Sequence, residues 1–144
     1  MAEPEPDEEQ HQVTVFAAVG GQPFFDRLVD RFYDHVADDE VLLPLYPDQV
    51  DLGPARRRLA LFLGQFWGGP DTYSAERGHP RLRMRHQPFA VDVAAREHWV
   101  DAMLDALRTT MPEAPLEDEL REVVEQRMAD YFRTAADHMV NTPG

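Results

Sequence analysis

Apolar residues recur at helical spacing through most of the chain, and this period restricts the fold to helices packed on helices. Phe25, Leu28, Val29, Phe32 and Val36 follow one another at intervals of one, three or four residues, which gives a helix with one apolar face. Alternation with a period of two, the pattern of a half-buried strand, is scarce. The period therefore predicts an all-α fold.

Turn and capping residues mark where the predicted helices begin and end. Gly-Gly pairs at 20–21 and 68–69 release the chain into turns. Pro23 and Pro54 suit first helical positions, and Asp92 can act as an N-cap. These signals predict helices over about 14–19, 23–37, 54–67, 92–110 and 116–140.

The segments between these helices are expected to be irregular. Pro44 and Pro47 interrupt 38–53, which predicts short turns. The stretch 68–80 is expected to be a loop, followed by at most a short helix over 80–87. On the last helix, the apolar face is predicted to comprise Leu120, Val123, Val124, Met128, Tyr131, Phe132, Ala135 and Met139.

Length and charge limit the classes of protein to which the chain can belong. Its 144 residues suffice for one domain with a sizeable core. We expect an acidic, disordered tail over 1–12 and a single domain over 13–144. The formal charge of −13 argues against nucleic-acid or anionic-membrane binding. No segment suggests a signal peptide or a membrane span, so a cytoplasmic location is the default expectation.

A cluster of arginines precedes a lone histidine, and both could serve one anionic ligand. Four arginines and His86 lie within 77–86, and the chain has no cysteine. No zinc-ligand spacing, P-loop or hydrolase motif is present. Haem is a flat apolar disc with two propionates, and its iron accepts an imidazole. From the residues alone, an exposed basic loop with an incidental histidine remains the alternative.

Separated motifs resemble the second group of truncated haemoglobins, in particular the actinobacterial O-type proteins. They occur in the same order: Gly-Gly at 20–21, RFY at 31–33, LYP at 45–47, FWGGP at 66–70, GHPRLRMRH at 78–86 and HW at 98–99. The resemblance implies a two-over-two helical sandwich, the truncated globin fold. The helices over 23–37 and 54–67 would cross those over 92–110 and 116–140.

The resemblance also implies haem b (iron protoporphyrin IX) as cofactor, with His86 as the proximal iron ligand. Arg58 matches a position that the family directs at a propionate, and Arg83 would be a second partner. Arg77, with Arg81 and Arg85, is expected to be solvated or structurally paired. The further residues predicted to contact the cofactor are Ala55, Leu59, Phe62 and Met84.

Three polar aromatic residues match the family's distal positions: Tyr33, Tyr46 and Trp99. Taken without the resemblance, they could equally be core aromatics. Dioxygen on ferrous haem carries partial negative charge, which O–H and N–H donors stabilise. A hydrogen bond to a charged group contributes about 1.5–3 kcal/mol, or roughly 10- to 150-fold in affinity. Ala55 replaces the distal histidine of ordinary globins, which disfavours peroxidase chemistry.

Three functions remain open at this point. The first is a haem protein that binds dioxygen, nitric oxide and carbon monoxide and releases dioxygen slowly. The second is an enzyme on the same haem, an NO dioxygenase or weak peroxidase supplied by an unidentified electron donor or reductase. The third is a haem-free helical interaction module. A homodimer is also open.

Overall fold

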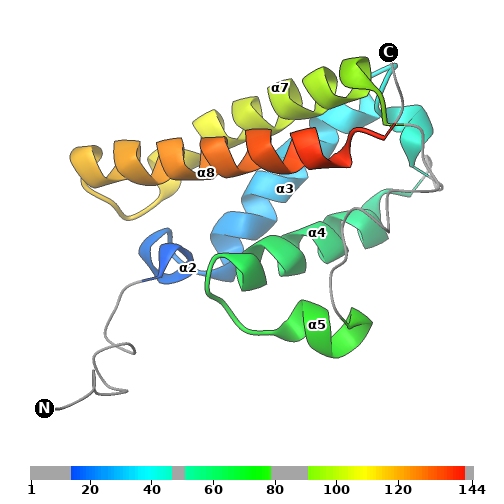
Figure 1. Cartoon of the computed structure of the whole chain (residues 1–144). Helices are drawn as coiled ribbons and strands as arrows, with labels where there is room; N and C mark the ends of the chain where they lie inside the picture. The colour runs from blue at the N-terminus through cyan, green and yellow to red at the C-terminus, as the bar shows by residue number, and fades with distance from the viewer. Residues whose placement is uncertain (1–13, 47–50, 79–90, 142–144) are drawn as a thin grey trace, which may run out of the picture.

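Two pairs of crossed helices make up the molecule (Figure 1). The computed structural model describes residues 14–46, 51–78 and 91–141. α7 and α8 lie side by side in one layer, and α3 crosses beneath them toward α4 (Figure 1). The short α5 packs against α4 on the side away from α8.

The elements within the described residues are all helical. In chain order they are α2 (Val15–Ala18), α3 (Gln22–Ala37), the 3₁₀ helix η1 (Leu43–Leu45), α4 (Gly53–Phe66), α5 (Thr72–Arg77), α7 (Val93–Thr110), the 3₁₀ helix η2 (Met111–Glu113) and α8 (Asp118–Met139). None of these helices combines the length and apolar character that crossing a membrane requires.

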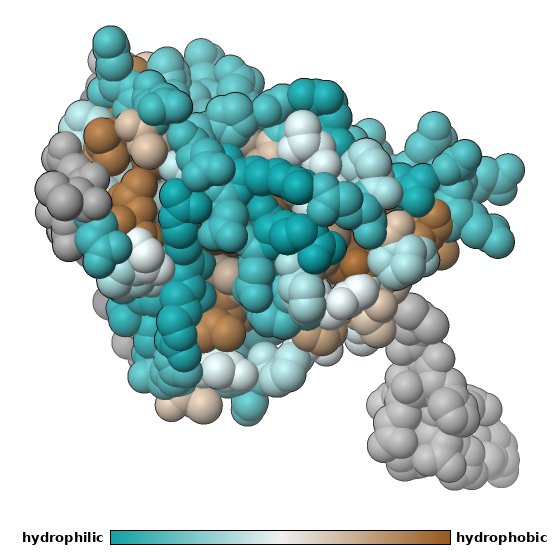
Figure 2. All heavy atoms as spheres, turned by 180° about the vertical axis from the view of Figure 1, so that it is seen from behind, coloured by the Kyte–Doolittle hydropathy of each residue, from teal (hydrophilic) through white to brown (hydrophobic). Residues whose placement is uncertain are grey.

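The core lies where α3 crosses α7 and α8, and large side chains fill it. Phenylalanines dominate the part of the core that α3 contributes, and methionines and leucines dominate the part that the other helices contribute. The largest fully buried side chains include Phe24, Phe25, Leu28, Phe32, Leu63, Met103, Leu107, Met111, Met128 and Phe132. Seen from behind, the surface is mostly hydrophilic, with hydrophobic atoms in recesses between polar side chains (Figure 2).

A close turn after α4 allows α2 to pack against the end of that helix. Gly68 has φ +108°, a left-handed conformation that favours glycine. A Cβ on Gly69 would lie 2.5 Å from the Phe16 ring and 2.8 Å from the Gly64 carbonyl oxygen. The Phe16 amide donates to the Trp67 carbonyl at 2.9 Å. The glycines therefore let the Phe16 ring approach the backbone closely.

The predicted helices are confirmed to within about two residues, and the Asp92 cap is present. Asp92 Oδ1 accepts a hydrogen bond from the Ala95 amide at 2.8 Å. Two predictions about 116–140 are wrong: Leu120 and Val123 are 49% and 62% exposed. Val124 takes the core position there, at helical spacing from the buried Met128 and Phe132.

The prediction of a loop over 68–80 is also wrong, since α5 occupies Thr72–Arg77. Contacts to α4 hold this short helix. Gln65 receives a hydrogen bond from the Ser74 amide at 2.9 Å and donates to the Ser74 hydroxyl at 2.7 Å. Arg57 donates to both Glu76 oxygens, at 2.7 and 2.8 Å. The predicted acidic tail over 1–12 and the short helix over 80–87 lie outside the described residues.

Candidate functional site

A single central cavity collects most of the residues that the sequence analysis selected. It has a volume of about 420 Å³, within the range of small-molecule and cofactor sites. All four main helices contribute to its wall. The lining residues are Tyr33, Leu42, Leu45, Tyr46, Ala55, Arg58, Leu59, Phe62, Leu63, Tyr73, Arg77, Val91, Ala95, Arg96, Trp99, Tyr131, Phe132, Ala135, Ala136 and Met139.

The three polar aromatics come from three elements and share one wall of the cavity. Tyr33 is on α3, Tyr46 directly follows η1, and Trp99 is on α7. The two tyrosine rings meet edge to face with centroids 5.4 Å apart. Phe32 bridges them to Trp99, at 5.0 Å from the Tyr33 ring and 5.5 Å from the indole. The sequence separation of these residues is large, so only the tertiary fold brings them together.

Both tyrosine hydroxyls are protonated donors at neutral pH. Burial raises the pKa of Tyr33, partly offset by a hydrogen bond from Tyr46 and by the charges of Arg58 and Arg56. Burial, together with Tyr33, raises the pKa of Tyr46 well above its usual value. A phenol of raised pKa keeps its proton and can donate it in a hydrogen bond.

The indole N–H of Trp99 has no hydrogen-bond partner among residues 14–46, 51–78 and 91–141. Its ring contacts Phe32 and Phe132 edge to face, at 5.5 and 6.0 Å. The indole lines the cavity and is half-buried. An indole N–H can only donate, so this group is available to a ligand in the cavity.

One face of α4 supplies a second, apolar wall. Ala55, Leu59 and Phe62 recur at helical spacing and all line the cavity. Arg58 comes from the same face, and it makes no hydrogen bond or ion pair within the part of the chain that the structure describes. Its guanidinium is exposed at the cavity, a position from which it could bind an anion.

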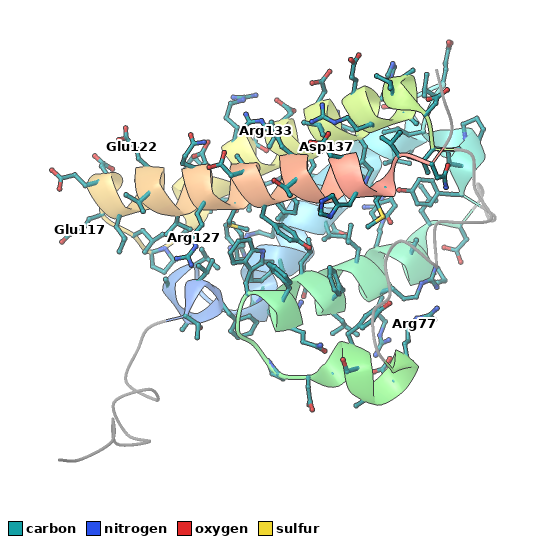
Figure 3. All side chains as sticks on the ribbon, viewed as in Figure 1. Arg77, Glu117, Glu122, Arg127, Arg133 and Asp137 are labelled. Carbon is teal, nitrogen blue, oxygen red and sulfur yellow. The ribbon has the colours of Figure 1, made fainter. Side chains whose placement is uncertain are left out.

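The charged residues of the described lining are all arginines: Arg58, Arg77 and Arg96. Arg77 ends α5, beside α4 (Figure 3). Arg96 is oriented by Asp137 of α8, whose Oδ1 accepts from Nε at 2.8 Å. In a chain with a formal charge of −13, an apolar cavity whose described lining carries three cations and no carboxylate fits a flat apolar ligand with acidic groups.

Comparison with known proteins identifies the family to which this chain belongs. The sequence model of the bacterial-like globin family matches residues 14–133. The chain belongs to the bacterial-like globins. It is 39% identical over 121 residues to the group 2 truncated hemoglobin YjbI of Bacillus subtilis, covering 84% of each chain. The predicted resemblance to group II truncated haemoglobins is thereby confirmed.

Solved globin structures share the fold. A thermostable hemoglobin from the actinobacterium Thermobifida fusca superposes with a TM-score of 0.81 at 47% identity, covering 91% of this chain and 99% of that one. A truncated oxygen-avid haemoglobin from Bacillus subtilis gives 0.76 at 34% identity, covering 89% and 99%. The predicted all-α truncated globin fold is therefore confirmed.

The predicted site residues that the structure describes all line the central cavity of this globin, where a single ligand could contact them. Tyr33, Tyr46 and Trp99 line the cavity together with the α4 residues Ala55, Arg58, Leu59 and Phe62. Their roles stay predictions. His86, Arg83 and Met84 lie outside the described residues.

Sequence reasoning missed several residues of the globin cavity. Arg77, expected to be solvated or structurally paired, is exposed and also contributes to the lining. Arg96 carried a usable signal, because it precedes Trp99 by three residues and so shares its helix face. Tyr131 and Phe132 were recognised only as apolar positions of the last helix. Burial raises the pKa of Tyr131 to about 12.

Proposed function

We propose that the protein is a haem protein that binds dioxygen, and also nitric oxide and carbon monoxide, and that it releases dioxygen slowly. The observation that supports this most is the central cavity, which combines apolar walls, three polar aromatic donors and arginines without a carboxylate in the described lining. Family membership points the same way. One relative of known structure is named an oxygen-avid haemoglobin.

The described lining fits haem b. Leu59, Phe62 and Phe132 offer flat apolar surface for a porphyrin. Arg58 offers a guanidinium without a hydrogen-bond or ion-pair partner in the described chain, and a guanidinium binds carboxylates in a two-pronged geometry. We assign Arg58 to a propionate and keep Arg83 as the second predicted partner.

His86 is the predicted iron ligand, and the visible spectrum tests it. Bound haem supplies an iron that takes an axial imidazole and, on the other face, a diatomic gas. We expect purified protein expressed with ample haem to show a Soret band at about 400 nm. His86→Ala should abolish the normal five-coordinate ferrous spectrum, whereas His138→Ala, at an exposed position on α8, should not change it. A colourless wild-type protein would overturn the proposal.

The distal donors give the protein slow ligand release. Two protonated phenols and one indole N–H line the same side of the cavity. The Tyr33 hydroxyl and the Trp99 N–H can donate to the negative end of a polarised diatomic ligand, and the Tyr46 hydroxyl, which donates to Tyr33, supports that phenol as a donor. A lost donor of this kind appears mainly in the dissociation rate, because association is limited by access rather than by the final hydrogen bond.

The alternative is a redox enzyme on the same haem. Proton transfer to a bound peroxide needs a distal base, and the described lining offers neither a histidine nor a carboxylate. NO dioxygenation needs a separate electron donor. Repeated turnover of nitric oxide with a cellular reductase would favour the enzyme, and a ferric product that no donor reduces would exclude sustained catalysis.

Three further predictions concern context. A cytoplasmic location, a reductase partner and a homodimer stay predictions of the sequence. Size-exclusion chromatography with light scattering at several protein concentrations tests the last of these directly.

A further inference from the structure

An ion pair on the surface joins the helix of Trp99 to the turn that leads to Tyr46. His98 Nδ1 lies 2.9 Å from Asp39 Oδ2 and 3.1 Å from Oδ1. His98 directly precedes Trp99 on α7, and Asp39 lies just beyond the end of α3. The two residues are 59 positions apart in sequence. The pair therefore bridges two of the three elements that carry distal donors.

The carboxylate of Asp39 also fixes the turn itself. Its Oδ1 accepts hydrogen bonds from the amides of Val41 and Leu42, at 2.8 and 2.9 Å. The Asp39 carbonyl accepts from the Leu43 amide at 3.0 Å, which leads directly into η1. Leu42 is 1% exposed and lines the cavity. One carboxylate thus sets the geometry of the segment that ends at Tyr46.

We propose that the His98–Asp39 pair is a positioning device that holds Tyr46 and Trp99 in register along one wall of the cavity, so that protonation of His98 controls how fast the bound gas leaves. The inference rests on the proposed function. His98 is not among the described lining residues of the cavity, and it acts through the two donors.

The charges around His98 set the direction of the pH effect. The hydrogen bond that His98 donates to Asp39 raises the pKa of His98, desolvation opposes this, and the charges of Asp39, Asp101 and Glu97 support it. For Asp39, desolvation works toward a higher pKa, but the hydrogen bonds from His98, Leu42 and Val41 outweigh it and lower the pKa. The charged groups of the described chain that act on His98 are all acids.

The charged pair is therefore complete below the ordinary histidine pKa and is lost as the pH rises through the raised pKa of His98. A raised pKa means that the imidazolium persists above the ordinary histidine value of about 6.5. Above that raised pKa, His98 becomes neutral and the tie between α7 and the turn weakens. The loss of Asp39 charge occurs only on strong acidification. We expect dioxygen release to accelerate as the pH rises from 6 to 9.

The experiment measures dioxygen dissociation of the haem-loaded full chain by stopped flow across that pH range. His98→Gln keeps a hydrogen-bond donor without a titrating charge, so its release rate should lose the pH-dependent step. His98→Ala should release dioxygen about two- to fivefold faster at pH 6.5, the range expected for one exposed ion pair. Asp39→Asn should return the His98 pKa, measured by NMR in the carbon monoxide complex, toward its ordinary value.

A second histidine pair provides a matched control. His35 Nε2 lies 2.7 Å from Asp105 Oδ2, and this pair joins α3 to α7. The side chain of His35 is 46% exposed and that of His98 is 44% exposed. Neither His35 nor Asp105 lines the cavity, and within the described residues no side-chain hydrogen bond joins either of them to the turn before Tyr46. His35→Gln should leave the pH profile of dioxygen release unchanged.

A structural readout completes the test. In the haem-loaded carbon monoxide complex, the amides of Val41 and Leu42 should exchange with solvent faster in His98→Ala than in wild type. If His98→Gln keeps the wild-type pH profile while Trp99→Phe still accelerates release, the positioning role is wrong and the proposed function stands. If the protein carries no haem, the proposed function itself fails.

Discussion

Trp99 has one hydrogen-bond donor, its indole N–H, and one substitution isolates the contribution of that donor to ligand binding. Trp99→Phe keeps an aromatic ring against Phe32 and Phe132 and removes the N–H. Because a hydrogen bond to a charged group contributes about 1.5–3 kcal/mol, we expect dioxygen to dissociate at least about tenfold faster. Stopped-flow displacement by carbon monoxide measures this, and an unchanged rate would show that Trp99 only packs.

Arg58 is the residue through which the cavity is expected to hold an acidic cofactor. Arg58→Gln should speed the transfer of haem to an apomyoglobin acceptor by about tenfold, since a charge-assisted hydrogen bond is lost. Arg127→Gln is the control, because Arg127 is exposed on α8, makes no ion pair with any residue that the structure describes, and lies far from Arg77 of the cavity lining (Figure 3). Equal transfer rates in both variants would contradict the assignment.

At this scale, sequence reasoning succeeded where residue chemistry and motif order coincided. Tyr33, Tyr46 and Trp99 all line the cavity, although no period in the sequence joins them. Arg96 was overlooked although it shares the helix face of Trp99, and its pairing with Asp137 of another helix is one that a single sequence does not reveal.

The helix that carries Trp99 begins at an N-cap, Asp92, whose own side chain is not part of the cavity lining. Asp92→Ala deletes the acceptor of the Ala95 amide, and we expect a loss of about 0.5–2 kcal/mol in the free energy of unfolding. Asp92→Asn retains an acceptor oxygen and should lose much less. Urea denaturation followed by circular dichroism measures both, and equal losses would assign the effect to charge rather than to the cap.

Element boundaries were predictable where local signals were strong. Glycine pairs, first-turn prolines and Asp92 marked α3, α4 and α7 to within about two residues. α5 was missed because its six residues show no apolar period, and its stability comes from Gln65 and Arg57 on α4. Tertiary contacts of this kind override local propensity.

At the scale of the whole molecule, the core tolerates little loss of volume. Met103 is fully buried in the main core cluster, and deleting most of such a side chain costs about 2–5 kcal/mol. Met103→Ala should therefore lower the melting temperature by several degrees, measured by calorimetry on the haem-loaded protein. Val123→Ala, at an exposed position of α8, should leave it nearly unchanged.

The arginine-lined cavity within an acidic chain has a kinetic consequence. At long range, a porphyrin with two propionates is repelled by the protein's formal charge of −13. Only at short range is it attracted by the guanidinium groups of the cavity. Raising the ionic strength from 0.01 M to 0.1 M shortens the Debye length from about 30 Å to about 10 Å. Added salt should therefore screen the long-range repulsion by the acidic protein more than the short-range attraction by the arginines. The rate of dicyanohaem uptake by the apoprotein should accordingly increase as salt is added. A decrease would mean that attraction by the arginines dominates the long-range electrostatic interaction.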